Sequence, residues 1–163
     1  QEVIPADIKA SDIDVSIGAS WIPLQYYNEF FENKFGISRE NWTLNRTNFS
    51  GEWLFNGNSF NVPLYNQQKY STPDKSVYEI ALAALHNTPI IIKKDSDIQA
   101  TDKYGKPKFD ERGNPVWKKI VDKEKTDLAN EKVEALKDEF EQWIFKDVER
   151  RNHLSRLYND CLL

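Results

Sequence analysis

Two pairs of adjacent lysines, Lys93-Lys94 and Lys118-Lys119, have the residue type and spacing best suited to binding a charged ligand in this chain, and Trp117 directly precedes the second pair. Lysine ammonium groups contact phosphates and an aromatic face stacks on bases, so the combination predicts a nucleic-acid surface. Charges on a hairpin are, however, usually only solvated. Because adjacent strand residues point to opposite faces, one lysine of each pair can face the same groove.

Asp12 and Asp14 are candidates for general acid–base chemistry. Residues i and i+2 of a strand face the same way, and two close carboxyl groups can share one proton, as a small hydrolase would require. Two acids on the wet face of an edge strand give the same pattern without catalysis. Gly18 follows, but a phosphate loop needs several glycines and usually a lysine, so we interpret Gly18 as a hinge between a strand and a helix.

Three tryptophans, Trp42, Trp53 and Trp117, fall in predicted strands, where aromatic faces can stack on sugars or bases. Tryptophan also packs well in strands, and we expect Trp42 and Trp53 in the core. A free-standing glycan- or protein-binding module that uses these tryptophans is the alternative functional hypothesis. For Trp117 both interpretations stay open.

Metal and cofactor sites have little support in the sequence. Cys161 is the single cysteine and His86 and His153 stand alone, whereas a zinc site normally takes about four Cys or His ligands at tight spacing. His86 ends a predicted helix, where it can meet the last carbonyl groups. We therefore expect no metal, no cofactor and no catalytic residue.

Apolar periodicity defines the elements that position these residues in the first half of the chain. Alternation over 13–17 predicts a half-buried strand, and helical spacing predicts a helix from 23 to 36. Residues 41–62 are interpreted as two or three short strands, with Asn56-Gly57 as a tight hairpin turn. A further helix is expected over 72–88, where it stops before a proline.

The second half predicts two antiparallel strands, 90–95 and 115–122, joined by a polar loop. A long helix follows, with Thr126 as its N-cap, and Asp147 is a cap for its continuation. Its apolar stripe is Ala129, Val133, Leu136, Phe140 and Trp143. No internal repeat is apparent. The fold class is therefore α+β, a small antiparallel sheet with hairpins packed on three to four helices, in a single domain over 1–163.

Composition limits the functional classes. The 163 residues, 39% of them hydrophobic, suffice for one domain with a sizeable core. A net charge of −4 weakens a simple nucleic-acid argument, but residues 93–125 carry ten basic and seven acidic side chains, a local +3. With no long apolar run and no signal peptide, we expect a soluble cytoplasmic protein. Because the chain starts at Gln1 and lacks methionine, we expect it to be cut from a longer polypeptide.

Three stretches together resemble a known kind of segment: "PADIKASDIDVSIGASWIP", "VYEIALAALHNTPIIIKKD" and "DKEKTDLANEKVEALKDEFEQWIFKDVERRNHLSRLYND". Their order and spacing are similar to the region that connects the adenine-specific DNA methyltransferase part to the Swi/Snf-type helicase part in very large proteins of phages, plasmids and conjugative elements. The signatures "IDVxxGxxWIP" and "WIFKDxxRRxxLxxxYN" carry the resemblance. It departs at Val148, where proline is expected, and after Asn159-Asp160, where Cys161 and two leucines follow.

This resemblance implies a non-catalytic accessory domain that positions DNA or the flanking enzymatic domains of the same chain. The Asn-Pro-Pro-aromatic motif of the methyltransferase and the phosphate loop and acidic box of the helicase are absent, and Asn114-Pro115 is followed by valine. No family active site can therefore be transferred to this chain. DNA, if bound, is expected to contact the hairpin of residues 90–122.

Overall fold

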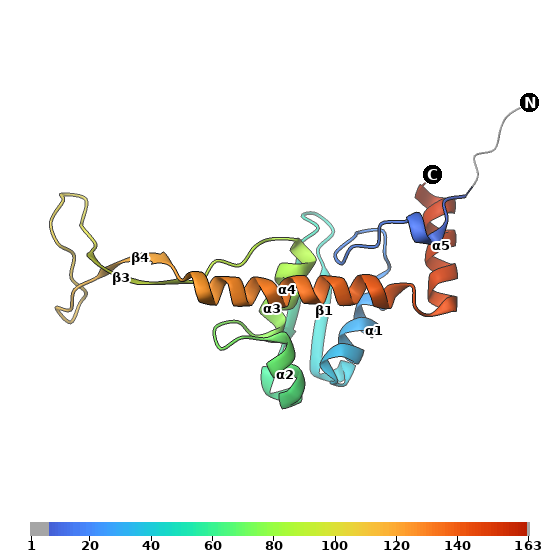
Figure 1. Cartoon of the computed structure of the whole chain (residues 1–163), viewed down its shortest axis with the longest axis horizontal. Helices are drawn as coiled ribbons and strands as arrows, with labels where there is room; N and C mark the ends of the chain where they lie inside the picture. The colour runs from blue at the N-terminus through green and yellow to red at the C-terminus, as the bar shows by residue number, and fades with distance from the viewer. Residues whose placement is uncertain (1–6, 163) are drawn as a thin grey trace, which may run out of the picture.

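The computed structural model describes residues 7–162 and divides into a helical body and a projecting two-stranded arm (Figure 1). The body contains α1 (Leu24–Phe35), β1 (Trp42–Arg46), β2 (Trp53–Gly57), α2 (Leu64–Tyr70), α3 (Val77–His86), α4 (Lys123–Ile144) and α5 (Val148–Leu162). The arm contains β3 (Lys93–Gln99) and β4 (Trp117–Val121). Both hairpins are antiparallel and two-stranded, so the α+β prediction is confirmed, with α2 as an additional helix in the described residues.

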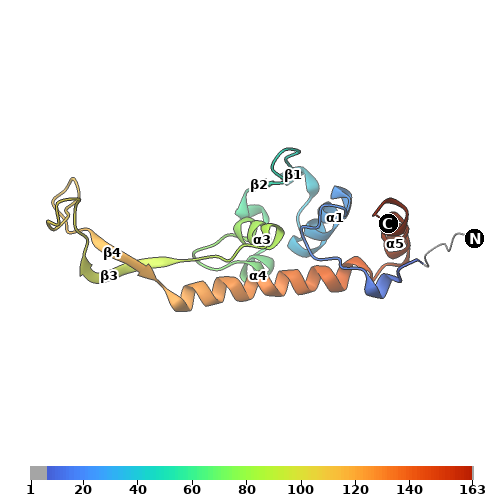
Figure 2. The ribbon, with the colours of Figure 1, turned by 90° about the horizontal axis from the view of Figure 1, so that it is seen from above.

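The core is built on the aromatic stripe of α1. The Tyr27 ring stacks on Phe140 of α4 with centroids 5.1 Å apart, and Phe31 meets Phe55 of β2 edge-on at 4.9 Å. All four side chains are buried, and pairs of this kind stabilise a core beyond the area that they remove from water. Gly36 ends α1 in the left-handed conformation, as predicted. In Figure 2 the other body elements lie along one side of α4, which explains its single apolar stripe.

The predicted strand over 13–17 is wrong. Ile13, Val15 and Ile17 are buried and alternate with more exposed residues, but the segment pairs with no strand in the described chain. It packs instead against the end of α3. At Gly18, φ is +93°, and a Cβ atom would lie 2.1 Å from the Leu85 carbonyl oxygen. Gly18 therefore does not join a strand to a helix as we interpreted it, and glycine is required there because its φ is positive and two backbones approach closely.

The β1–β2 hairpin turns at a different place from the one predicted. The turn spans 47–52, with Gly51 at φ +68°, whereas Asn56 and Gly57 lie inside β2 opposite Thr43 and Trp42. Gly57 is needed for close packing, because a Cβ there would lie 2.4 Å from the Tyr78 hydroxyl.

The long helix α4 starts earlier than predicted. Its N-cap is Asp122, whose side chain accepts a hydrogen bond from the Lys125 N–H at 3.2 Å, and Thr126 lies inside the first turns. The last member of the buried stripe is Ile144, while Trp143 is half-buried. The predicted start of α3 also shifts, because Ser76 caps it.

A capped corner joins α4 to α5. The Arg150 guanidinium donates to the carbonyl oxygens of Ile144 (2.8 Å) and Trp143 (2.6 Å) and lies 3.7 Å from the Trp143 ring centroid. The Asp147 carboxylate accepts from the Arg150 N–H at 2.9 Å, so the predicted cap is confirmed. Beyond the corner, Asn159 makes two hydrogen bonds to the backbone of Ile8 and holds the N-terminal segment on α5.

Candidate nucleic-acid interface

The arm, residues 93–121, is fixed to the body by side chains of α4. The Asn130 amide accepts from the Ile90 N–H and donates to the Ile90 carbonyl, both at 2.9 Å. One helical turn earlier, the Thr126 hydroxyl accepts from the Ile92 N–H at 2.9 Å and donates to the Ile92 carbonyl at 3.1 Å. Because residues i and i+4 of a helix lie on one face, these two side chains clamp the extended segment that enters the arm. The clamp sets the direction in which the arm leaves the body (Figure 2).

All five predicted interface residues lie on the arm and are exposed. The register pairs Lys93 with Val121, Lys94 with Ile120 and Asp95 with Lys119. Directly opposed residues share a face of a sheet, and neighbours along a strand do not. Lys93, Lys119 and Trp117 therefore lie on one face and Lys94 and Lys118 on the other, which divides each lysine pair as expected.

The arm has a net positive charge, whereas the rest of the chain is acidic. It has eight basic and five acidic side chains, a net +3, whereas the rest of the chain has fourteen basic and 21 acidic, a net −7. Lys119 forms an ion pair with Asp95, so the face with Trp117 keeps less net charge than its two lysines suggest. The charge separation favours an anionic ligand at the arm.

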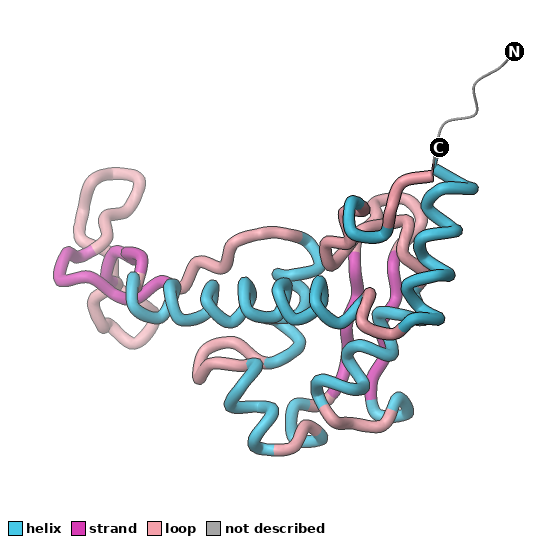
Figure 3. Tube along the Cα trace, turned by 45° about the vertical axis from the view of Figure 1, so that its right-hand side comes forward, coloured by secondary structure: helices cyan, strands magenta, loops and turns pink. Residues whose placement is uncertain are grey.

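The tip of the arm is a three-way junction formed by Ala100, Lys108 and Val116. The Ala100 N–H donates to the Val116 carbonyl (2.7 Å), the Lys108 N–H to Ala100 (2.8 Å), and the Val116 N–H to Lys108 (3.0 Å). These three hydrogen bonds close a cycle. The strands of the arm and two loops leave it in three directions, and Figure 3 shows the loops spreading away on two sides of the strands.

The two loops, 101–107 and 109–115, have the same construction. In the first, Asp102 Oδ1 accepts from the N–H groups of Tyr104 (2.8 Å) and Lys106 (3.0 Å). In the second, Asp110 Oδ1 accepts from Arg112 and Asn114, both at 2.9 Å. Each loop has a glycine with positive φ three residues after the aspartate. The pattern Asp-x-x-Gly-x-Pro thus occurs twice with a period of eight, which corrects the expectation that the chain has no internal repeat.

Exposure separates the tryptophans. Trp42 and Trp53 are 2% and 4% exposed and belong to the core, so neither can stack on a glycan. Trp117 is 38% exposed, and the tip adds Tyr104 and Phe109 at 76% and 57%. Tyr104 and Phe109 were not among the predicted interface residues, although their position beside turn residues and lysines was a usable signal.

The other predicted candidates have structural roles. Asp14 accepts hydrogen bonds from the N–H (3.2 Å) and hydroxyl (2.7 Å) of Ser16, while Asp12 lies in a single 3₁₀ turn. His86 lies in the last turn of α3, and its Nε2 accepts a hydrogen bond from the Trp53 N–H of β2 at 2.9 Å. The phenol of Tyr26 bonds His153 Nδ1. Within residues 7–162, no three His, Cys, Asp or Glu side chains gather as a metal site would require.

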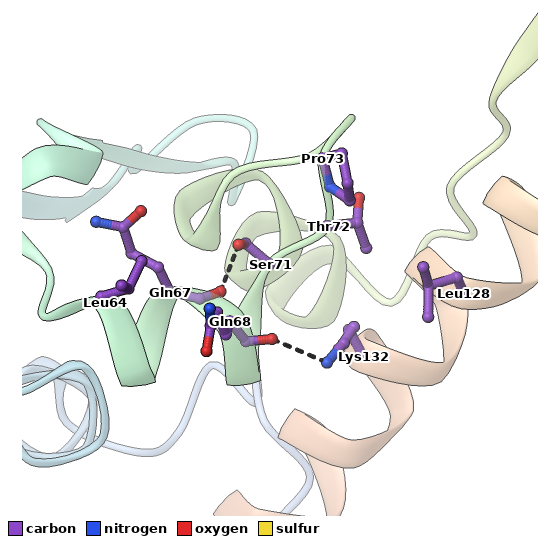
Figure 4. A pocket seen from close by; sticks show the side chains of 8 residues that line it. All are labelled: Leu64, Gln67, Gln68, Ser71, Thr72, Pro73, Leu128 and Lys132. Atoms are coloured by element: carbon purple, nitrogen blue, oxygen red, sulfur yellow. Dashed lines mark hydrogen bonds between the residues drawn. The ribbon is translucent and has the colours of Figure 1, made fainter.

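A groove also lies between α2 and α4 (Figure 4). Leu64 and Leu128 supply apolar surface, and Lys132 is its one charged residue. The Lys132 ammonium already donates to the Gln68 carbonyl at 3.1 Å, and the Ser71 hydroxyl bonds Gln67. The groove therefore has no set of available polar side chains that could catalyse a reaction.

The fold and the arm define a small α+β module whose projecting hairpin has a net positive charge while the rest of the chain is acidic. Residues 16–162 match the family described as Domain of unknown function (DUF8437), and the chain belongs to this family. No curated protein and no solved structure matches the chain. No helix in the described residues has the length and apolar character to cross a membrane.

Proposed function

We propose that this protein is a non-catalytic DNA-binding module in which the clamped arm of residues 93–121 contacts the phosphate backbone. The single observation that carries the proposal is the placement of net positive charge on an arm that projects from an acidic body. An acidic body repels DNA, so it favours contact through the arm alone.

The dimensions of a two-stranded ribbon suit this role. The major groove of B-DNA admits a two-stranded β-ribbon. Every residue of β4 is exposed, so both faces of the arm are available to the two walls of a groove. Lys94 and Lys118 on one face and Lys93 on the other supply two or three phosphate contacts. That number predicts shallow salt dependence, with a log–log slope of about −2 to −3.

We further propose that the module connects the DNA methyltransferase and helicase parts of a large cytoplasmic protein of a mobile genetic element. Support for this context is the resemblance of the three sequence stretches quoted above. In such a protein the clamp at Thr126 and Asn130 would hold the arm at a fixed angle to the body, so that bound DNA is oriented relative to the enzymatic parts.

Titration of fluorescently labelled duplex DNA at low salt tests the proposal. The variant Lys93→Glu, Lys118→Glu, Lys119→Glu should lose binding. A matched control, Lys9→Glu, Lys34→Glu, Lys146→Glu, changes the net charge equally on the body and should bind as the native protein does. Binding that is equal in all three proteins, or absent in the native one, would refute the arm as a DNA surface.

Activity assays test the non-catalytic part of the proposal. The purified chain should transfer no labelled methyl group to DNA, hydrolyse no ATP and cut no DNA, because its sequence lacks the motifs for those reactions. Methyl transfer by the purified chain would refute it.

A further inference from the structure

We infer that the tip of the arm binds unpaired bases, which stack on Phe109 and Trp117 while the lysines hold the adjoining backbone. The inference rests on the proposed function and adds its substrate class: DNA that contains a single-stranded stretch beside duplex. Aromatic side chains that project from a positively charged surface are the usual means of binding single strands without sequence preference.

Phe109 and Trp117 project from the same side of the three-way junction. Phe109 directly follows Lys108 and Trp117 directly follows Val116, and side chains alternate along an extended chain. Lys108 and Val116 have equivalent positions in the hydrogen-bonded cycle, so their side chains share a side and both aromatic side chains leave on the opposite one. Phe109 pairs with Pro115, and Trp117 pairs with Gln99, so neither is opposed by a charged residue across its strand.

The junction makes this aromatic surface rigid before any ligand arrives. Its closed cycle of three hydrogen bonds fixes the residues that precede Phe109 and Trp117, and the Gln99 amide adds a bond to the Lys108 carbonyl at 2.9 Å. Rigid aromatic side chains lose little conformational entropy on binding, which lowers the cost of association.

Charge at the tip favours a nucleic acid over an apolar protein partner. The tip segment, residues 100–116, has four cations: Lys103, Lys106, Lys108 and Arg112. Of the three acidic residues there, Asp102 and Asp110 each use Oδ1 to accept two backbone N–H groups. Their charge is thus partly compensated locally, while the cations stay exposed to a phosphate chain.

Three DNA probes of one length distinguish the modes of binding: a duplex, the same duplex with a central run of mismatched thymidines, and a thymidine single strand. The native protein should bind the mismatched duplex and the single strand more tightly than the duplex. Phe109→Ala and Trp117→Ala should each weaken binding to unpaired DNA by roughly fivefold to a hundredfold, the range for one lost stacked base. Phe109→Ala should not change affinity for the duplex, and Trp117→Ala should weaken duplex binding less than it weakens binding to unpaired DNA. Phe60→Ala, which removes a 90% exposed ring from the body, is the matched control and should have no effect on any probe.

Two further measurements separate the loss of base stacking from a structural disturbance of the tip. Phe109→Leu retains apolar bulk but lacks a flat aromatic face, so it should lose the preference for unpaired DNA even if alanine disturbs the tip. A 2-aminopurine base in the single strand should be quenched by the native protein and less by either alanine variant.

The outcomes separate the two hypotheses. Duplex binding without preference for unpaired DNA, and unchanged by the aromatic variants, would overturn the stacking inference and leave the proposed function standing. Failure of the native protein to bind any of the probes would overturn both. Retention of the preference in Phe109→Leu and Trp117→Ala would equally reject base stacking at the tip.

Discussion

Gly18→Ala is expected to be the most destabilising glycine substitution in the body, and Gly51→Ala is its matched control. Both glycines have positive φ, +93° and +68°. They differ in space: a Cβ on Gly51 would meet its nearest atom, in the Arg46 guanidinium, at 3.8 Å, whereas a Cβ on Gly18 would lie 2.1 Å from the Leu85 carbonyl oxygen. The pair therefore separates conformational strain from steric overlap.

The expected free energies follow from these two effects. Alanine in a left-handed conformation costs about 1–2 kcal/mol, and both variants lose stability by this amount. Overpacking against backbone that cannot rotate away costs about 1–3 kcal/mol more, and applies to Gly18 alone. Alanine also restricts the unfolded chain by the same amount in both variants, so that contribution cancels in the comparison. Gly51→Ala should lose about 1–2 kcal/mol and Gly18→Ala about 2–5 kcal/mol.

Urea unfolding followed by tryptophan fluorescence measures both losses, since Trp42 and Trp53 are buried in the body. The slope of the free energy with urea must stay unchanged for the comparison to be valid. Equal losses in the two variants would show that the segment around Gly18 moves away from α3 at no cost, and would refute the close approach as the reason for glycine.

Three other expectations concern the corner, the clamp and alkaline pH. Arg150→Met should lower the free energy of unfolding in urea by about 2 kcal/mol, because two helix carbonyls lose a charged donor. Arg151→Met is the control and should lower it little, because the hydrogen bond from Arg151 to the Phe145 carbonyl is 3.4 Å long. Asn130→Ala should lose about 1–3 kcal/mol and increase amide exchange at the base of the arm, since it leaves two backbone groups unpaired; unchanged exchange would refute the clamp. Burial, with help from Glu139, raises the pKa of Tyr70 from 10.0 to about 12, so the unfolded chain deprotonates first and stability should fall between those pH values. Tyr70→Phe should make that fall shallower in urea titrations at several pH values, and an equal fall would contradict the assignment.

Local periodicity predicted the elements whose apolar residues face one side. The α1, α3 and α4 stripes were visible in the sequence for this reason. The β3–β4 pairing was predicted instead from two strand-like runs on either side of turn residues, since β3 and β4 have no buried residue. The helix α2 was missed because Leu64 and Tyr65 are 69% and 76% exposed, so the segment has no buried stripe to detect. The strand expected over 13–17 failed for the opposite reason: alternation shows burial but not the presence of a pairing partner, which depends on distant parts of the chain.

The candidate site was predicted in part. The lysine pairs and Trp117 are exposed on a hairpin, as their composition indicated. Thr126 and Asn130 were not recognised as a clamp, because a polar residue on a helix has the same appearance whether it caps, binds backbone or is solvated. The repeated loop was detectable as two copies of Asp-x-x-Gly-x-Pro.

The two signatures that suggested a family have structural explanations in this chain. In "IDVxxGxxWIP", the isoleucines and the valine are buried and Gly18 allows the approach to α3. The half-buried Trp21 packs edge-on against Tyr158, with ring centroids 5.2 Å apart. In "WIFKDxxRR", Asp147 and Arg150 cap the corner between α4 and α5. These residues specify the body, so the resemblance concerns the scaffold, and the interface must be tested at the arm.

The three-way junction also bears on the order in which the chain folds. The bonds from Lys108 to Ala100 and from Val116 to Lys108 each join residues eight apart, and a loop of this size closes in roughly 10–100 ns. Once Lys108 has met Ala100 and Val116, the third bond joins residues that are already neighbours and adds little closure entropy. All of these contacts are local in sequence, whereas the body must bring α1 to α4 across about a hundred residues. The tip can therefore assemble early and independently, and its shape need not wait for the core.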